Sequence, residues 1–259
     1  MPFVEIPAGR MHYELDGPTN APALVLSNSL GTTLAMWDPQ LAPLSRRFRL
    51  LRYDTRGHGL SAAPPGPYSL ADLGGDVIAL LDALQISRAH FCGLSMGGAI
   101  GLWLGANALE RLEKLIACNT SAHLGTIEGW NSRMAAVRNG GMQSAIAGGL
   151  MERWFTAEFR AKHPEVVDSI RRMVLDAPVE GYLACCAAMR DADLRERVAA
   201  IRIPTLLIAG TGDPVTPPAD AEFLAATIPA ARLRELPAAH LSNLEAAAEF
   251  SEAVLQFLS

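Results

Sequence analysis

Much of the sequence consists of short, mostly apolar runs. Longer stretches, in which apolar residues recur with helical spacing, separate these runs. Runs of this kind, with little alternation of polar and apolar residues, are typical of strands covered on both faces of a sheet. The stripe of apolar residues from Leu70 to Leu84 predicts an amphipathic helix that opens at Ser69. Strands alternating with helices predict an α/β fold with a parallel sheet. The predicted buried strands are residues 23–27, 49–53, 89–94, 112–119 and 204–210.

The alternation is interrupted in the second half of the chain. Residues 121–197 have helical spacing, and no run in them predicts a strand. Helices inserted between two strands, at the carboxyl edge of a parallel sheet, form a cap or lid. We therefore expect residues 1–120 and 198–259 to form the core and residues 121–197 to form the cap. The remaining predicted core elements are a hairpin (3–6 and 11–16), a short helix capped by Asp38, a helix (219–228) and a last strand (232–236).

Composition restricts the class of protein. The 259 residues are 50% hydrophobic, enough for one large domain with an insertion, and the net charge of -5 disfavours nucleic acid or an anionic membrane as a partner. No signal-like N-terminal pattern or long apolar run is present, so we expect a cytoplasmic protein. The four cysteines fit no metal-ligand spacing and are expected to be buried hydrophobic residues, the adjacent pair Cys185 and Cys186 included.

The first candidate for chemistry is the sequence Gly93-Leu94-Ser95-Met96-Gly97. It follows a predicted strand and precedes a predicted helix over residues 96–107, which is the context of a nucleophile elbow. Side chains at Gly93 or Gly97 would collide with neighbouring backbone in such a turn. An ordinary tight turn can carry the same pattern, so the motif alone leaves the role of Ser95 open.

Two later residues complete a possible catalytic set. Asp213 follows the predicted strand 204–210, on the sheet edge where Ser95 emerges, although a lone Asp-Pro can also be only a turn. His240 follows the last predicted strand, so the three residues occur in the order serine, aspartate, histidine. His58 is the competing histidine, but it precedes the serine in a glycine-rich loop and is better explained by loop stabilisation.

With these residues in place, the chain resembles the α/β-hydrolase superfamily over nearly its whole length, and within it the 3-oxoadipate enol-lactonases of aromatic-acid catabolism. The fold that this resemblance implies is a mostly parallel, eight-stranded twisted sheet flanked by helices, with an inserted helical cap. The elbow and the sequence Asp54-Thr55-Arg56-Gly57-His58-Gly59 occur across the superfamily. The segments more particular to enol-lactonases are Asn28-Ser29, Trp130-Asn131-Ser132-Arg133 and Arg153-Trp154-Phe155-Thr156.

The resemblance implies hydrolysis of a five-membered enol-lactone with a carboxymethyl arm to 3-oxoadipate, in the β-ketoadipate pathway, without a metal or organic cofactor. Ser95 would attack the lactone carbonyl, His240 would take its proton, and Asp213 would orient the imidazole. The backbone N–H groups of Leu30 and Met96 would form the oxyanion hole.

The substrate carboxylate requires a cation, and the cap is where we expect it. Arg133 is the first candidate because it stands beside Trp130 early in the cap, and Arg190 is the second. Either arginine could instead be an ordinary solvated residue. Trp130 and Trp154 could form walls of the substrate pocket or simply pack the cap on the core.

Rival functions share much of this machinery. A general carboxylesterase, a perhydrolase or a carbon–carbon bond hydrolase would use the same three residues. Dehalogenases and epoxide hydrolases of this fold are disfavoured, because a resemblance to them would require an aspartate at the position of Ser95. A non-catalytic ligand receptor would keep the pocket and lose the chemistry, which the intact serine, aspartate and histidine disfavour.

Overall fold

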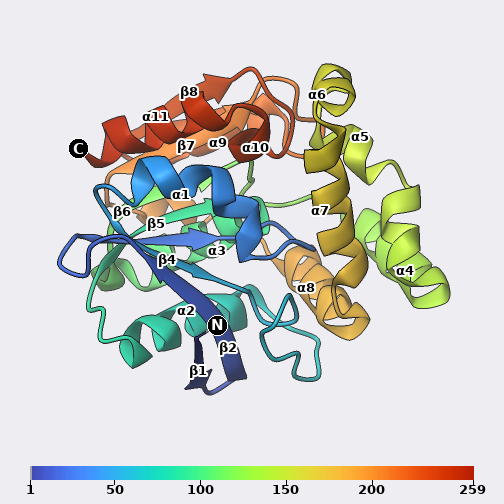
Figure 1. Ribbon diagram of the computed structural model, residues 1–259, viewed down its shortest axis with the longest axis horizontal. Coiled ribbons are helices and arrows are strands. Elements are labelled where there is room, and N and C mark those ends of the chain that lie inside the picture. Colours follow the sequence, from blue (N-terminus) through green and yellow to red (C-terminus); the bar gives the residue numbers. More distant parts are fainter. Residues whose placement is uncertain (1) are drawn as a thin grey trace.

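The computed structural model describes residues 2–259 and contains one eight-stranded sheet (Figure 1). The strand order is β1-β2-β4-β3-β5-β6-β7-β8; β2 is antiparallel to both β1 and β4, and every later pair is parallel. This confirms the predicted mostly parallel sheet. The strands are β1 (Phe3–Ile6), β2 (Gly9–Asp16), β3 (Ala23–Ser27), β4 (Arg49–Tyr53), β5 (Ala89–Leu94), β6 (Leu112–Cys118), β7 (Thr205–Gly210) and β8 (Ala231–Leu236).

Helices flank the sheet, which lies between α2 on one side and α1 with α11 on the other in the view of Figure 1. Helix α3 packs on β3, β5 and β6, and α9 packs on β7 and β8. The core helices are α1 (Asp38–Leu44), α2 (Leu70–Ala83), α3 (Met96–Asn107), α9 (Pro218–Thr227), α10 (Ser242–Glu245) and α11 (Ala247–Leu258). No helix within residues 2–259 has the length and apolarity needed to cross a membrane.

Five helices lie between β6 and β7 and gather at one end of the sheet (Figure 1). They occupy the stretch in which the sequence predicts helices and no strand. Helix α4 packs on α7 and α8, so the cap has internal contacts of its own. The domain boundaries at residues 120 and 197 stay a prediction. The cap helices are α4 (Ile127–Ala147), α5 (Leu150–Trp154), α6 (Ala157–Lys162), α7 (Pro164–Asp176) and α8 (Val179–Asp191).

Burial explains why the apolar runs form strands. Every residue of β7 is buried, as are the last four residues of β3, β4, β5 and β6. Strands covered by helices on both faces need side chains that prefer the protein interior in every position. Because these strands are parallel, their carboxyl ends lie at one edge of the sheet, and the loops that follow them carry polar residues.

Local signals fix where two of the helices begin. Ser69 caps α2 as predicted, in a capping box in which its hydroxyl accepts from the Asp72 N–H. The predicted N-cap role of Asp38 is wrong. A 3-10 turn, Leu34–Trp37, runs directly into α1, so Asp38 is already the first helical residue, and its carboxylate instead accepts a hydrogen bond from Arg52 at 2.9 Å.

Candidate active site

The turn at Ser95 is strained in the way that a nucleophile elbow requires. Ser95 has φ of 59°, a left-handed conformation that is uncommon for residues other than glycine. A Cβ at Gly93 would lie 2.1 Å from the Gly97 carbonyl oxygen, and one at Gly97 would lie 2.2 Å from the Ser27 carbonyl oxygen. Both glycines are therefore required by close backbone packing, as predicted.

Ser95, His240 and Asp213 meet at the carboxyl edge of the sheet. The Ser95 Oγ lies 2.9 Å from His240 Nε2, and His240 Nδ1 lies 2.8 Å from Asp213 Oδ2. With a proton on the Nδ1 that faces the carboxylate, Nε2 is free to accept the serine proton. All three side chains are buried, so this arrangement excludes bulk water from the base.

Asp213 is held by more partners than the sequence indicates. Its Oδ2 also accepts hydrogen bonds from the Thr216 hydroxyl at 2.6 Å and from Asn119 Nδ2 at 3.0 Å. Its Oδ1 accepts from the Val215 and Thr216 N–H groups. Burial alone would raise the pKa of Asp213, but the charge of His240 and hydrogen bonds from His240, Thr216 and Asn119 outweigh burial and lower that pKa. The carboxylate therefore stays ionised beside the base.

The catalytic cavity is small and is walled by core and cap together. Its volume is about 40 Å³, and a second cavity of about 170 Å³ adjoins it. The two share Leu124, Trp130, Arg133 and Val215 among their lining residues. Of the residues that the sequence proposed for contact with substrate, the smaller cavity contains all except Arg190. It is lined by Ser29, Leu30, Ser95, Met96, Leu124, Trp130, Arg133, Trp154, Met189, Val215 and His240.

Leu30 and Met96 line this cavity with backbone donors available. Among residues 2–259, no protein group accepts a hydrogen bond from either N–H. The loop of Leu30 is fixed on both sides, since the Gly97 N–H donates to the Asn28 carbonyl at 3.0 Å and the Gly31 N–H donates to His58 Nε2 at 2.8 Å. Two unpaired donors on a fixed loop and a helix start can stabilise an oxyanion.

His58 lies behind the loop that carries Leu30 and does not line the cavity beside Ser95. It is fully buried, its Nε2 accepts from Gly31, and its Nδ1 faces the Arg56 carbonyl at 3.3 Å. Burial lowers the pKa of His58, although the Arg56 carbonyl and Asp54 act in the opposite direction. A neutral ring with its proton on Nδ1 satisfies both contacts. This geometry agrees with the loop-stabilising role expected from the sequence.

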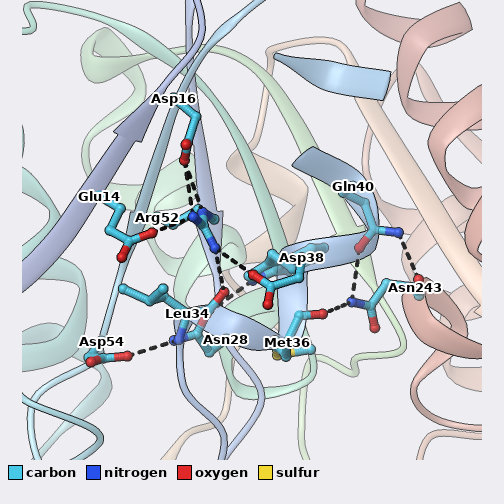
Figure 2. A network of polar contacts seen from close by, with 11 residues as sticks. Glu14, Asp16, Asn28, Leu34, Met36, Asp38, Gln40, Arg52, Asp54 and Asn243 are labelled. Atoms are coloured by element: carbon cyan, nitrogen blue, oxygen red, sulfur yellow. Dashed lines mark hydrogen bonds and ion pairs between the residues drawn. The ribbon is translucent and has the colours of Figure 1, made fainter. Parts of the chain in front are cut away.

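A wider polar network pins the same loop to the sheet (Figure 2). Arg52, only 3% exposed, donates to Glu14, Asp16 and Asp38 and reaches the Leu34 carbonyl. The Leu34 N–H in turn donates to Asp54 at 2.8 Å. Further along the network, Asn28 Oδ1 accepts from the Trp37 indole, and Asn243 Nδ2 donates to the Met36 carbonyl at 2.9 Å. The loop that carries Leu30 is thereby joined both to β2 and to the segment that follows His240.

Arg133 lines the cavity, and within residues 2–259 it forms no ion pair with a carboxylate. Its Nε donates to the Tyr182 hydroxyl at 2.7 Å, and its guanidinium lies over the rings of Trp130 and Tyr182 at 5.6 and 5.5 Å. One guanidinium nitrogen, Nη2, is buried without a hydrogen-bond partner in the described part of the chain. A buried, unsatisfied cationic donor is costly, and a bound anion would satisfy it.

The second candidate cation lies elsewhere. Arg190 is paired with Asp191 through two hydrogen bonds and with Asn131 through a third. It lines a surface pocket that contains none of the catalytic residues. Both tryptophans, by contrast, line the catalytic cavity: the Trp130 indole donates to the Leu124 carbonyl at 2.6 Å, and the Trp154 ring lies 6.3 Å from that of His240.

A larger groove of about 550 Å³ lies between α7 and the core and contains another histidine–carboxylate pair. His12 Nδ1 lies 2.8 Å from Asp54 Oδ2, and within residues 2–259 the buried His12 Nε2 has no partner. Without a hydroxyl at that nitrogen, the pair lacks the nucleophile that Ser95 supplies beside His240. The smaller cavity is therefore the candidate active site.

The free cysteines and acidic residues form no metal site in the described part of the chain. Cys92 and Cys118 lie on neighbouring strands with their sulfur atoms 3.9 Å apart, and Cys185 and Cys186 are buried in α8. Burial raises the pKa of the Cys118, Cys185 and Cys186 thiols, which keeps them protonated. All four cysteines are buried, as predicted.

Comparison with known proteins identifies relatives over nearly the whole chain. Residues 22–247 match the family described as alpha/beta hydrolase fold. The chain is 44% identical over 244 residues to 3-oxoadipate enol-lactonase 2 of Acinetobacter baylyi, covering 94% of this chain and 91% of that protein. It superimposes on the crystal structure of the enol-lactonase from Burkholderia xenovorans LB400 with a TM-score of 0.97 at 47% identity, covering 99% of each chain. A hydrolase from Pseudomonas aeruginosa PA01 gives a TM-score of 0.96 at 49% identity, covering 100% of this chain and 98% of that one.

Proposed function

The chain belongs to the α/β-hydrolase family, and from that premise we propose that it hydrolyses 3-oxoadipate enol-lactone to 3-oxoadipate in aromatic-compound catabolism. The observation that carries the proposal is that one cavity is lined by Ser95, His240, two free backbone donors and Arg133. The Nη2 of this arginine has no partner in the described part of the chain. The serine, the histidine and the backbone donors perform ester hydrolysis, and the arginine selects an ester that carries a carboxylate. The similarity to two proteins named as enol-lactonases supports the same substrate.

In the first half of the reaction, the Ser95 oxygen attacks the lactone carbonyl as its proton passes to His240 Nε2. Asp213, ionised and bonded to Nδ1, stabilises the imidazolium that forms. The carbonyl oxygen becomes negative and is bound by the Leu30 and Met96 N–H groups. Each such donor is worth roughly 10²–10³ in rate.

Collapse of this intermediate breaks the bond between the acyl carbon and the ring oxygen. The leaving group is an enolate, which is stabilised by delocalisation. It takes the proton from the His240 imidazolium and ketonises, so the imidazole is neutral again. Because the substrate is cyclic, the ketone stays attached to Ser95 as part of the acyl group. Water, deprotonated by His240, then attacks the ester carbonyl and releases 3-oxoadipate with the serine proton restored.

The carboxymethyl arm of the substrate is the proposed ligand of Arg133. The guanidinium has one nitrogen unpaired, and Tyr182 fixes its orientation. A cavity of about 40 Å³ holds only a few water molecules, which is less than the ring and arm of the lactone require. We therefore propose that substrate binding merges the inner cavity with the adjoining one by displacing the cap wall that carries Trp130.

The location and the remaining partners are also proposals. Four unpaired cysteines fit a reducing compartment, which supports the cytoplasm. The substrate is a small anionic molecule, and we propose neither nucleic acid nor a membrane as a partner, in keeping with the acidic net charge.

The experiment that tests the proposal is a spectrophotometric assay of enol-lactone hydrolysis beside hydrolysis of a neutral short-chain ester. We expect kcat/KM for the lactone to exceed that for the ester by at least about 10²-fold, because the ester cannot use the cation. Similar values for the two substrates would favour a general carboxylesterase. No reaction of Ser95 with a phosphonate probe would favour a ligand receptor.

A further inference from the structure

A single side chain of the core, Glu245, joins the cap to the loop that carries the catalytic histidine. Its Oε2 accepts a hydrogen bond from the Ala239 N–H at 2.9 Å. Its Oε1 accepts from the Thr156 N–H at 3.2 Å and from the Thr156 hydroxyl. Thr156 belongs to the cap, between α5 and α6, and Ala239 directly precedes His240. One carboxylate therefore satisfies donors on both sides of the boundary between cap and core.

A second link flanks His240 on its other side. The Leu241 N–H donates to the Trp154 carbonyl at 3.1 Å, so the residues before and after the histidine are both tied to the segment from Trp154 to Thr156. Trp154 itself lines the catalytic cavity, with its ring 6.3 Å from the His240 ring. The cap segment that would meet the substrate is thus also the segment that holds the base.

We propose that Glu245 is a positioning residue through which the cap sets the alignment of His240 toward Ser95. Asp213 fixes the imidazole by its Nδ1, and the two cap links fix the backbone from which the imidazole projects. When a substrate displaces the cap wall, the Thr156–Glu245–Ala239 contacts keep the base loop in register with Trp154. This inference rests on the proposed function only for the identity of that substrate, because the geometry concerns the base itself.

The first test measures kcat and KM of Glu245→Gln. The control is Glu249→Gln, which makes the same charge change at an exposed position of α11. Glutamine has no charge and one acceptor oxygen, so a neutral amide replaces the carboxylate that accepts from Ala239 and Thr156 through two oxygens. We expect kcat to fall roughly tenfold, the loss typical of one charge-assisted hydrogen bond, while KM changes less than about twofold. Glu249→Gln should leave both constants unchanged. An unchanged kcat in correctly folded Glu245→Gln protein would overturn the proposal.

The second test separates positioning from a simple brace. The rate at which a fluorophosphonate labels Ser95 depends on His240 and needs no lactone, so it stays informative if the proposed substrate is wrong. Glu245→Gln and Thr156→Val should each slow labelling, and the double variant should be no slower than Glu245→Gln alone, because both changes break one link. A lowered thermal midpoint with wild-type labelling in the folded protein would assign Glu245 to stability alone. Effects that multiply in the double variant would show that Thr156 and Glu245 do not act through one link, which would overturn the role given to the cap.

Discussion

The two halves of the candidate active site are built in opposite ways. Around Asp213, both carboxylate oxygens are saturated with protein donors, and the histidine beside it has a partner at each ring nitrogen. Around Arg133, the guanidinium makes one hydrogen bond within residues 2–259, and its buried Nη2 has no partner among them. The first region is complete without a ligand, whereas the second is complete only with one.

From this difference we propose that the first region determines the rate and the second determines the selectivity. A saturated network holds the reacting groups in one geometry and costs no reorganisation during the reaction. An unsatisfied cation destabilises the free protein slightly and is repaid on binding an anion, so it discriminates between charged and neutral esters. Breaking the first region should therefore affect every substrate, and breaking the second should affect anionic ones.

The largest effect is expected from Ser95→Ala. Without the nucleophile, kcat should fall by at least about 10⁴-fold for the lactone and for a neutral ester alike. Removal of one hydroxyl from a cavity wall should change the thermal midpoint very little. Steady-state kinetics and a melting curve on the same preparation check both expectations. Normal turnover by the folded variant would refute the role assigned to Ser95.

The next effect should separate the two regions. Arg133→Ala is expected to raise KM for the anionic lactone by about 10²-fold, since a buried charge-assisted pair is lost, while KM for a neutral ester changes less than about threefold. Arg190→Ala is the matched control, because Arg190 is paired at the surface outside the cavity. Equal losses on both substrates would remove Arg133 from the carboxylate-binding role.

A smaller effect in the Arg133 region is expected from Tyr182→Phe. This variant keeps the ring over which the guanidinium lies and removes only the hydroxyl that accepts from Arg133 Nε. The arginine should lose orientation, raising KM for the lactone roughly tenfold, the value of one hydrogen bond to a charged group at the lower end of its range. Hydrolysis of the neutral ester should be unaffected. A matching loss with that ester would mean that Tyr182 supports the catalytic residues instead.

The smallest effect concerns His58, behind the loop that carries Leu30, and the dependence of stability on pH. Because the fold lowers the pKa of His58, this side chain takes up a proton near pH 6.5 in the unfolded chain but only at lower pH in the folded chain. The free energy of unfolding should therefore decrease as the pH falls through about 6.5 toward the lowered pKa of the folded state. Urea unfolding of wild type and His58→Gln between pH 7.5 and 5 measures this slope. An equally steep decline in the variant would exclude His58 as its source.

The elements nearest the chemistry were the most predictable from the sequence. The helix after Ser95 begins and ends where its pattern predicts, at Met96 and Asn107, because a glycine-flanked turn and a buried strand fix its start. The strand before Asp213 was predictable because its continuous, buried apolar run has few alternatives. The strand before His240 has no such run, since it carries exposed Arg232, Arg234 and Glu235. The catalytic roles themselves stay predictions that the variants above test.

The supporting residues were not predictable because their partners are remote in the chain. Glu245 meets Thr156 across 89 positions, and Asn119 meets Asp213 across 94. Nothing local marks either residue, whereas a capping or turn motif is contained within a few neighbours. Asp38 failed for a related reason: its sequence suits an N-cap, but the buried Arg52 of β4 takes its carboxylate.

Through Arg52, the opening hairpin of β1 and β2 supports residues outside its own strands. Glu14 and Asp16, both in β2, supply two of the three carboxylates that face this arginine, and Arg52 also contacts the loop on which Leu30 lies. Trimming the chain to Gly17 would leave a guanidinium with one counter-ion and a loosened oxyanion loop. Expression variants and fusion proteins that shorten this end should therefore be judged by turnover number, even when they fold and purify normally.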